Sequence, residues 1–417
     1  MPNQQHVVPF MCRFCGATTR FRFIDLGMAP LCESYLSASQ LNQMEPFYPL
    51  DVYTCESCFL VQLQEYVPRS AIFHEYAYFS SYSDSWVKHA RTYTEMIAEH
   101  QGLGAGSFVV EVGSNDGYLP RHFLAKGIPV LGIEPAANIA KEAERKGVRA
   151  VWSFFGKEAA LSLVAEGKRA DLIIGNNVLA QVPDLNDFLK GVKGLLNSEG
   201  VVTMEFPHLM RLIEGNQFDT MYLEHLSYFS LYTVERVFAA HGLQVCDVEE
   251  LPTHGGSLRI YAQHSENPKQ WGSSRVAELR AREIEAGFTN TDFSHDFGER
   301  VKETKWKLLE FLILLKRRGK HIAGYGVPGK GNTRLNYCGI RTDLLDYTVD
   351  RNTYKQGKYT PGPHIPICPV ERIRETKPDY VLILPWNIEE EVMQQMAYIR
   401  EWGGQFVVPI PEVHVCR

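Results

Sequence analysis

Long apolar runs, blocks of like charge and low-complexity tracts are all missing from this chain of 417 residues. The longest apolar stretch in a helical segment, LLEFLILL at 308–315, is far shorter than the roughly 20 residues that cross a bilayer. The amino terminus, MPNQQHVVPF, has no charged segment followed by an apolar one, so no secretory signal is expected. With 43 basic and 49 acidic residues, the chain also lacks the basic face that nucleic acids and anionic membranes attract. We therefore expect a cytoplasmic protein that acts on a small molecule, and we expect a monomer.

The nine cysteines show no disulfide framework. Four of them form two CxxC pairs, Cys12 with Cys15 and Cys55 with Cys58, and the other five are scattered. Two such pairs supply the four thiolates of a closed, structural zinc site, with a redox dithiol as the alternative. Residues 1–75 are therefore expected to form a small lobe that zinc folds without doing chemistry.

Strand-like and helix-like segments alternate after this lobe. Apolar strands are expected in SFVVEVGSNDGYL, IPVLGIEP, ADLIIGNNVL and GVVTMEFPHL, and their spacing predicts a parallel, doubly wound sheet over residues 76–265. Residues 266–318 are charged and predict a helical connector, and a second α/β unit begins near residue 320. The predicted fold class is α/β, with a zinc lobe, a Rossmann-like domain and a second Rossmann-like domain. The helical connector and the second Rossmann-like domain together make up residues 266–417.

The first glycine loop follows VVEV and reads Glu111-Val-Gly113-Ser-Asn115-Asp-Gly117. Glycine allows close backbone approach of a ligand, and the acid that ends the next strand, Glu134, can accept both ribose hydroxyls. No GxGxxG is present here for a pyrophosphate, so the pattern indicates S-adenosylmethionine (SAM).

Further candidates for SAM contacts lie on other segments. Two asparagines at the end of a later strand suit the floor of the site, and a tyrosine-rich segment before the domain suits a lid, although its aromatics also fit simple packing. The full set of candidate SAM-binding residues is Tyr78, Ser80, Glu111, Gly113, Asn115, Gly117, Glu134, Pro135, Asn176 and Asn177.

The second glycine loop, Gly324-Tyr-Gly326-Val-Pro-Gly329, does match GxGxxG, and Asp350 lies 21 residues beyond it. Alone, this pattern would predict a nicotinamide cofactor and an oxidoreductase. However, Lys330 and several later donors suit the diphosphate, base or sugar of a nucleotide-linked substrate equally well. A solvated basic loop is the remaining alternative. The candidate substrate-binding residues here are Lys330, Asn332, Arg351, Lys355, Tyr359 and His364.

Two histidines lie in segments that suit a reaction centre. TMYLEHLSYFS (220–230) places Tyr222, Glu224 and His225 in an aromatic run, and it fits either a general base or a packed core histidine. In a helical turn, Tyr222 and His225 would share a face while Glu224 points elsewhere. In THGGSLRIY, the pair Gly255 and Gly256 after His254 fits either close approach to a ligand or a tight turn.

The order of these motifs resembles one family. The series is CxxC…CxxC, EVGSNDGYL, GNNVLAQVPDLNDF, YLEHLSYFS, THGGSLRIY, GYGVPGKGNTRLNYCGI and DRNTYKQGKYTPGPHIPI. It resembles the SAM-dependent C-methyltransferases of deoxysugar and antibiotic biosynthesis, which act on nucleotide-linked 4-keto sugars, and it covers essentially the whole chain. Within that family it is most similar to the C-3′-methyltransferases of the tetronitrose and kijanose type, whose substrate is a dTDP-3-amino-4-keto-2,3,6-trideoxyhexose.

The resemblance implies a zinc lobe, a SAM domain and a carboxyl-terminal domain that helps to hold the nucleotide sugar. It also implies that His225 is the base that removes the C-3 proton. The enolate oxygen then needs a donor, for which Tyr222, Tyr76 or His254 are candidates. Glu224 would fix the histidine tautomer or bind an amino or hydroxyl group of the sugar.

Gln181 departs from the family pattern, which reads NVLAHVPD where this chain has NVLAQVPD. Glutamine can hydrogen-bond but cannot carry a proton at neutral pH, so one alternative base is absent here. O- or N-methylation of a nucleotide sugar remains an alternative reaction. A zinc-knuckle protein that binds nucleic acid is a further alternative, which the acidic net charge disfavours.

Overall fold

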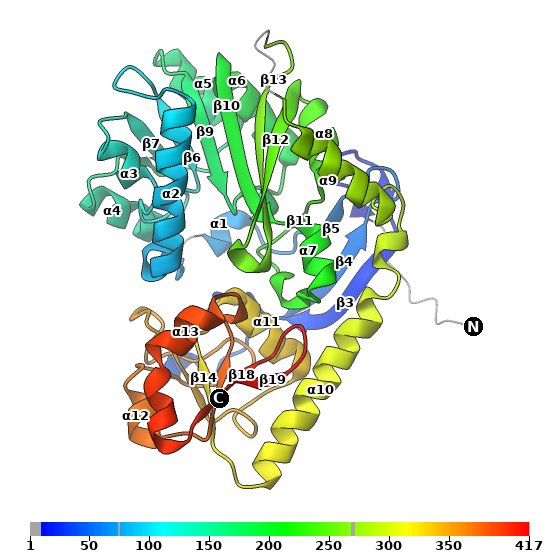
Figure 1. Ribbon diagram of the computed structural model, residues 1–417, viewed down its shortest axis with the longest axis vertical. Helices are drawn as coiled ribbons and strands as arrows, with labels where there is room; N and C mark the ends of the chain where they lie inside the picture. The colour runs from blue at the N-terminus through cyan, green and yellow to red at the C-terminus, as the bar shows by residue number, and fades with distance from the viewer. Residues whose placement is uncertain (1–9, 74–75, 268–271, 417) are drawn as a thin grey trace.

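The computed structural model describes residues 10–73, 76–267 and 272–416. Residues 1–9, on which most of the signal-peptide expectation rests, lie outside that part of the chain. Figure 1 shows an α/β unit above a second one, with the strands of the zinc lobe and one long helix joining them along a single side. In the described residues, no helix is long and apolar enough to cross a membrane.

The zinc lobe contains a small hairpin and an antiparallel sheet of four strands. The hairpin pairs β1 (Phe10–Met11) with β2 (Thr18–Thr19), and α1 (Arg69–Ile72) ends the lobe. The sheet has the order β11-β5-β4-β3, formed by β3 (Phe21–Ala29), β4 (Tyr48–Thr54), β5 (Val61–Leu63) and β11 (Ser227–Tyr228). Strand β11 comes from the segment directly after His225, so main-chain pairing ties the lobe to that segment.

The upper unit is built on a seven-stranded sheet with the order β12-β13-β10-β9-β6-β7-β8. Its strands are β6 (Val109–Val112), β7 (Val130–Ile133), β8 (Ala150–Val151), β9 (Ala170–Asn176), β10 (Leu196–Pro207), β12 (Leu243–Leu251) and β13 (Ser257–His264). The helices around it are α2 (Asp84–His100), α3 (Pro120–Leu124), α4 (Ala137–Arg145), α5 (Lys157–Ala165), α6 (Leu185–Leu195), α7 (Leu209–Glu214) and α8 (Leu231–Ala239). Each strand expected from the sequence is confirmed.

The expectation of a wholly parallel sheet is wrong at one edge. Strands β6 to β10 run parallel, but β13 is antiparallel to both β10 and β12. A parallel pair needs a crossover of a dozen or more residues. Only a short turn over 252–256 joins β12 to β13, so these two strands form a hairpin.

The lower unit has a six-stranded sheet with the order β16-β15-β14-β17-β18-β19. Its strands are β14 (Ile322–Tyr325), β15 (Tyr347–Val349), β16 (Ile367–Cys368), β17 (Tyr380–Ile383), β18 (Gln405–Val408) and β19 (His414–Cys416), all parallel except the last. Its helices are α11 (Gly329–Cys338), α12 (Arg372–Thr376) and α13 (Glu389–Gln395). The helices expected in the connector are present as α9 (Ser274–Glu285) and α10 (Phe297–Arg317).

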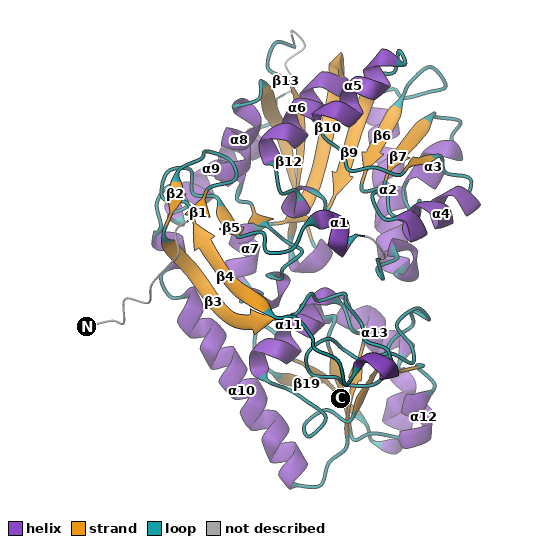
Figure 2. Ribbon diagram, turned by 180° about the vertical axis from the view of Figure 1, so that it is seen from behind, coloured by secondary structure: helices purple, strands orange, loops and turns teal. Residues whose placement is uncertain are grey.

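The zinc lobe packs into the cores of both α/β units. Cys55 and Leu60 belong to one apolar cluster with Phe206 and Phe229 of the upper unit. Phe23, on β3, contacts Phe297 at the start of α10 and belongs to a cluster that includes residues of the lower sheet. Figure 2 shows β3 and β4 between the two units on the side of α10. The lobe therefore fixes how the two sheets face each other.

Candidate active site and zinc centre

One cavity of about 1430 Å³ lies between the two α/β units. Gly113, Glu134 and Asn176, which line it, stand at or just after the carboxyl ends of β6, β7 and β9. From the opposite side, Gly326 and Asp350 line it directly after β14 and β15. Ligands of parallel α/β sheets bind outside the carboxyl ends of the strands, and here the edges of two sheets share one space.

The first glycine loop has the geometry of a nucleoside cradle. Gly113 has a φ of +65°, and a Cβ there would lie 2.4 Å from Val178 Cγ2, so only glycine fits. Glu134 accepts hydrogen bonds from the backbone N–H groups of Asn115 at 3.0 Å and Ala136 at 2.9 Å. Burial raises the pKa of Glu134 to about 7, and these N–H groups oppose the rise. A loop without a side chain at Gly113, next to an acid that lines the cavity, fits the nucleoside part of SAM.

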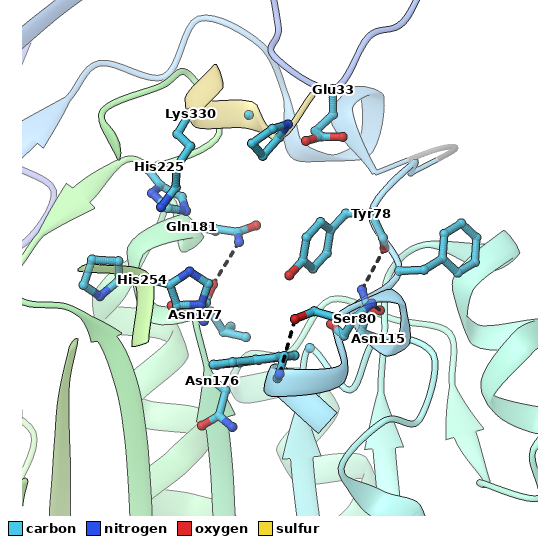
Figure 3. A pocket seen from close by; sticks show the side chains of 18 of the residues that line it. Glu33, Tyr78, Ser80, Asn115, Asn176, Asn177, Gln181, His225, His254 and Lys330 are labelled. Carbon is cyan, nitrogen blue, oxygen red and sulfur yellow. Dashed lines mark hydrogen bonds between the residues drawn. The ribbon is translucent and has the colours of Figure 1, made fainter. Parts of the chain in front are cut away.

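Most of the predicted SAM-binding residues line this end of the cavity. They are Tyr78, Ser80, Gly113, Asn115, Glu134, Pro135, Asn176 and Asn177. Asn115 uses its side chain to join the loop to the lid, because Oδ1 accepts from Ser80 N at 2.8 Å and Nδ2 donates to Tyr78 O at 3.1 Å (Figure 3).

Glu111 and Gly117 do not line the cavity. Glu111 is fully buried beneath the loop, and burial raises the pKa of its carboxyl well above the usual range. Gly117 is required by packing, since a Cβ there would lie 2.8 Å from Val148 Cγ2. The structure therefore gives these two residues supporting positions rather than positions in contact with a ligand.

His225 faces the cavity in a single tautomer. Its Nδ1 lies 3.2 Å from the carbonyl oxygen of Thr220, which can only accept, so Nδ1 carries the proton. The Nε2 lone pair accepts a hydrogen bond from the Tyr222 hydroxyl at 2.8 Å. Burial lowers the pKa of His225 to about 3, so the imidazole is neutral at physiological pH. The one lone pair of this neutral ring is thus held by Tyr222, and it can accept a proton from another group only when the Tyr222 hydroxyl gives up that hydrogen bond.

Glu224 does not contact His225, contrary to the expectation that it fixes the tautomer. Its carboxylate accepts hydrogen bonds from Cys32 N at 2.9 Å and Cys32 Sγ at 3.0 Å, and it lies outside the main cavity. The reason is the turn at 222–225, in which His225 N bonds Tyr222 O and places those two side chains on one face. The Thr220 carbonyl performs the orienting role instead.

Three other candidates for the reaction centre also line the cavity, namely Tyr76, Gln181 and His254. Gln181 Nε2 donates to the carbonyl of Asn177 at 2.9 Å, and the Asn177 amide nitrogen lies 2.9 Å from His254 Nε2. Burial lowers the pKa of His254 to about 3, so this imidazole is neutral as well. Figure 3 shows His225, Gln181 and His254 on one side of the cavity and Tyr78 on the other.

Gly255 and Gly256 do not line the cavity, which favours the tight-turn interpretation. Gly255 has a φ of +91°, and a Cβ there would lie 2.3 Å from the Trp386 ring. Gly256 has a φ of +122°, and a Cβ there would lie 2.7 Å from Arg211 Cβ on α7. Gly255 thus allows the β12–β13 hairpin to pack against Trp386 of the lower unit, and Gly256 allows it to pack against α7.

Three of the predicted substrate-binding cations, Lys330, Arg351 and Lys355, line the lower side of the cavity. Two of them already have carboxylate partners. Lys355 Nζ lies 3.3 Å from Glu33 Oε2, and Arg351 lies 3.3 Å from Asp84 Oδ2. Lys330 Nζ donates instead to the neutral Asn387 Oδ1 at 2.8 Å.

The other three predicted substrate-binding residues lie away from the cavity. Asn332 is fully buried and donates to the carbonyl of Cys32 at 2.7 Å. Tyr359 forms a main-chain bridge with Leu36, and His364 Nε2 lies 2.9 Å from Glu45 Oε2. All three hold the zinc lobe against the lower unit, a long-range role that their local sequence does not reveal.

The GxGxxG loop after β14 is explained by internal packing. A Cβ at Gly324, Gly326 or Gly329 would lie within 3.0 Å of a protein side chain. At Gly329 that side chain is Cys32, 2.7 Å away. The acid expected to bind a ribose, Asp350, lines the cavity and accepts hydrogen bonds from Val327 N in the glycine loop and from Asn352 N.

Sequence reasoning missed several residues that line the cavity. Trp86 stacks on His89 with ring centroids 5.1 Å apart and meets His254 edge-on at 4.9 Å. Their spacing of three on α2 was the available signal, because residues i and i+3 share a helix face. Glu33 and Arg69 also line the cavity from the zinc lobe, and no local pattern marks either one.

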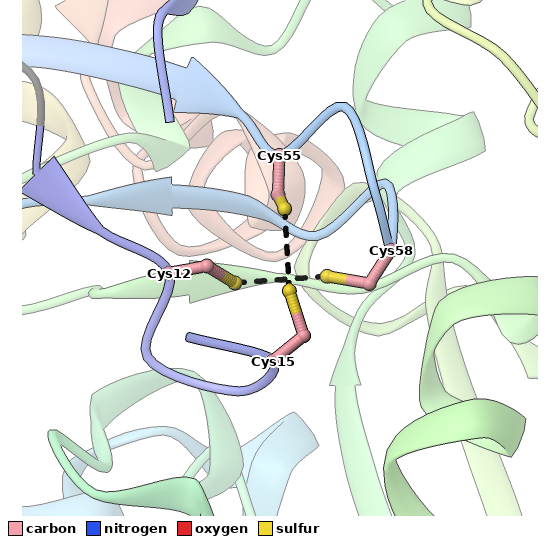
Figure 4. Close-up of side chains that lie close together, drawn as sticks. All are labelled: Cys12, Cys15, Cys55 and Cys58. Carbon is pink, nitrogen blue, oxygen red and sulfur yellow. Dashed lines mark hydrogen bonds between the residues drawn. The ribbon is translucent and has the colours of Figure 1, made fainter. Parts of the chain in front are cut away.

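The four predicted zinc ligands converge at one point (Figure 4). The Sγ atoms of Cys12, Cys15, Cys55 and Cys58 all lie within 4.8 Å of one another, with Cys12 and Cys58 3.6 Å apart and Cys15 and Cys55 3.5 Å apart. No pair is bonded as a disulfide. Four thiol groups around one centre fit a tetrahedral zinc ion.

One known protein matches the chain over nearly its whole length. The chain is 34% identical over 409 residues to the C-methyltransferase NovU of Streptomyces niveus, which covers 97% of this chain and 96% of that protein. Family models match as a zinc binding domain at residues 12–73, a methyltransferase domain at 87–248 and a C-methyltransferase C-terminal domain at 252–411.

Solved structures resemble parts of the chain only loosely. A SAM-dependent methyltransferase from Clostridium acetobutylicum is 12% identical, with a TM-score of 0.35 over 43% of this chain and 92% of that one. The methyltransferase CcbJ from Streptomyces caelestis is 13% identical, with a TM-score of 0.33 over 42% and 89%. The assignment rests instead on the full-length relative and the family models. The chain belongs to the SAM-dependent C-methyltransferase family, with SAM and zinc as its cofactors.

Proposed function

We propose that the protein methylates C-3 of a dTDP-linked 3-amino-4-keto-2,3,6-trideoxy sugar through an enolate, as a step of deoxysugar and antibiotic biosynthesis. One observation carries the proposal. His225 is a neutral imidazole of fixed tautomer in a cavity that has a nucleoside cradle on one side and a cationic wall on the other. The choice of sugar follows the resemblance of the motif series.

In this proposal the upper sheet holds SAM. When bound, SAM supplies an electrophilic methyl group, and the sulfur keeps the electron pair of the broken C–S bond. Glu134 accepts the ribose hydroxyls, and Gly113 leaves room for the cofactor along the loop. The lid residues Tyr78 and Ser80, joined to the loop by Asn115, exclude water from this end.

His225 acts as the base. A carbon next to a ketone is a weak acid, so its deprotonation needs a base and a stabilised enolate oxygen. His225 Nε2 takes the C-3 proton after the Tyr222 hydroxyl leaves it to donate to the substrate. The Thr220 carbonyl keeps the imidazolium in place through Nδ1. Such a base contributes roughly 10²–10⁴-fold in rate.

The lower sheet holds the nucleotide sugar. Arg351 at the end of β15 is half exposed at the edge of the cavity and can contact the diphosphate. The Glu33–Lys355 pair faces the same space and can contact both the amino group and the hydroxyl groups of the sugar. In the proposed complex, C-3 lies between His225 and the SAM methyl group.

The reaction class is tested by mass spectrometry of products from SAM and a panel of nucleotide-linked ketosugars. We expect a mass gain of one methylene unit, with the new methyl group on carbon by NMR. His225→Asn should retain SAM binding and lose methyl transfer by at least about 10²-fold. His295→Asn, at a strongly exposed histidine far from the cavity, is the matched control. Methylation at oxygen or nitrogen, or normal turnover of His225→Asn, would overturn the proposal.

A further inference from the structure

The amino-terminal turn of α11 packs directly against the turn at 222–225 that carries Tyr222 and His225. A Cβ on Gly329 would lie 3.6 Å from Tyr222 Cζ, and Pro328 and Gly329 both line the cavity. Tyr222 in turn bonds the Nε2 atom of His225. The positive end of the helix dipole and the side chain of Lys330 therefore point to the region of His225.

Lys330 is held firmly at this position. Its Nζ donates to Asn387 Oδ1 at 2.8 Å and lies 4.6 Å from the centre of the Trp386 ring. The residue is only 8% exposed, and that exposure is toward the cavity that it lines. A side chain with two fixed contacts keeps its ammonium group in place before a substrate arrives.

Lys330 differs from the other two cations of the cavity wall. Lys355 and Arg351 each have a carboxylate within 3.3 Å. For Lys330, no carboxylate in the described part of the chain lies within 4.0 Å of Nζ. The nearest buried acid, Asp219, is bonded to Arg334 and to Trp386 Nε1. The charge of Lys330 is thus the least compensated of the three.

The charge of Lys330, which Asp219 compensates only in part, acts on both His225 and His254. After burial, Lys330 is one of the charges that lower the pKa values of His225 and His254, and Figure 3 shows Lys330 and His225 at the same end of the cavity. The groups that face Lys330 are these two neutral imidazoles, the carboxylate of Asp219 and the guanidinium of Arg334. A negative charge that develops between Lys330 and His225 would be strongly stabilised.

We propose that Lys330 is a catalytic residue that contacts the 4-keto oxygen and stabilises the enolate, rather than an anchor for the diphosphate. This inference rests on the proposed function. The C-3 proton goes to His225 Nε2, the electron pair of the C–H bond forms a double bond between C-3 and C-4, and the π pair of the ketone moves onto O-4 beside the ammonium group. The C-3–C-4 π pair then forms the bond to the transferred methyl group, the pair of the broken C–S bond stays on sulfur, and the pair on O-4 restores the ketone.

The test separates chemistry from anchoring. Exchange of the C-3 proton is followed by NMR in D₂O with the ketosugar and S-adenosylhomocysteine, and binding of dTDP alone is measured by calorimetry. For Lys330→Gln, we expect exchange to fall by about 10²–10³-fold, the usual loss on removal of one oxyanion donor, with dTDP affinity within about threefold of wild type. Lys330→Arg, which keeps the charge, should restore part of the exchange. A loss of dTDP affinity with normal saturated exchange would make Lys330 an anchor and overturn the inference.

Asn387→Asp provides a second test that keeps the lysine. It places a carboxylate beside Nζ and compensates the charge of Lys330, so the rate of C-3 proton exchange should fall at least about tenfold. The carboxylate also raises the pKa of Lys330, so the alkaline pH at which exchange is lost should be higher than in the wild type. Unchanged exchange in this variant contradicts the inference even if Lys330→Gln does not fold. If wild-type protein shows no exchange while SAM and dTDP both bind, the proposed carbon-acid function fails first, and the inference with it.

Discussion

The two glycine loops of this protein each follow a strand in the parallel part of a sheet, but they differ in sequence pattern and in charge. In each, an acid from the neighbouring strand, Glu134 or Asp350, accepts hydrogen bonds from the loop backbone. Arg121 and Lys126 follow the first loop but do not line the cavity, whereas Lys330 and Lys355, which follow the second loop, do line it. The first loop therefore suits the sulfonium and ribose of SAM, and the second suits an anionic nucleotide sugar. The proposed function therefore assigns the two ligands from the charge around each glycine loop and not from the glycine pattern.

Loss of zinc should have the largest effect and should act on both sides of the comparison. Cys55 belongs to the core of the upper unit, and the zinc lobe presents Cys32 to Gly329 of the second loop and pairs β5 with β11 beside the turn of Tyr222 and His225. Structural zinc contributes on the order of 10 kcal/mol to small domains. For Cys55→Ser, we expect loss of metal by mass spectrometry, loss of turnover and weaker SAM binding. A metal-free variant with normal turnover would contradict this role.

Alanine at a glycine with positive φ in each loop, Gly113 or Gly326, should separate the two ligands. Gly113→Ala forces a side chain into a left-handed conformation and against Val178, so SAM affinity should fall by at least about 10²-fold. At Gly326, φ is +75° and an added Cβ would lie 2.8 Å from Pro385 Cδ. Gly326→Ala should therefore weaken dTDP binding and leave SAM affinity within about threefold of the wild type. Calorimetry gives both affinities, and thermal unfolding checks that each variant is folded. Equal loss of SAM binding in both would remove the distinction.

The paired acids should also differ in their effect on SAM. Removal of hydrogen bonds to a charged group costs about 1.5–3 kcal/mol, so Glu134→Ala should weaken SAM binding by about 10–100-fold. Asp350→Ala should leave SAM binding within about twofold, because its contacts are within the second loop. A strong loss of SAM affinity in Asp350→Ala would indicate that the second loop holds the cofactor.

SAM affinity, which depends on Glu134 beside the first loop, and turnover, which depends on Lys330 after the second loop, should change with pH in opposite directions. Burial raises the pKa of Glu134 to about 7, so SAM affinity should fall as pH drops below 7 and the carboxylate is protonated. Burial lowers the pKa of Lys330 to about 8, so saturated turnover should fall as pH rises above 8 and the ammonium is lost, by up to about tenfold per pH unit. The pKa of His225, about 3, predicts no loss of turnover near pH 6.5 from this residue. A profile of affinity and turnover from pH 5.5 to 9.5 checks all three.

The sequence predicted the elements that have a strong local signal. Apolar runs predicted the strand ends at Gly113, Glu134 and Asn176. Residue spacings predicted the zinc cysteines and the turn that pairs Tyr222 with His225. A strand signal does not show direction, so the antiparallel β12–β13 hairpin was missed.

Contacts between distant segments could not be read in the same way. Glu224 points to Cys32, 192 residues earlier, and Asn332 bonds the same residue from 300 residues later. Likewise, the sequence suggested a diphosphate site from three cations, but it did not show that two of them are neutralised by Glu33 and Asp84. Which charges remain uncompensated is a property of the packed structure.

The central claim is that two sheets hold two different ligands in one cavity at the same time. It is tested most directly by calorimetric titration of dTDP into protein saturated with S-adenosylhomocysteine. The account predicts one dTDP site, with an affinity within about threefold of that in the absence of S-adenosylhomocysteine, and no displacement of either ligand by NAD⁺. Mutual exclusion of dTDP and S-adenosylhomocysteine, or displacement of dTDP by NAD⁺, would contradict it.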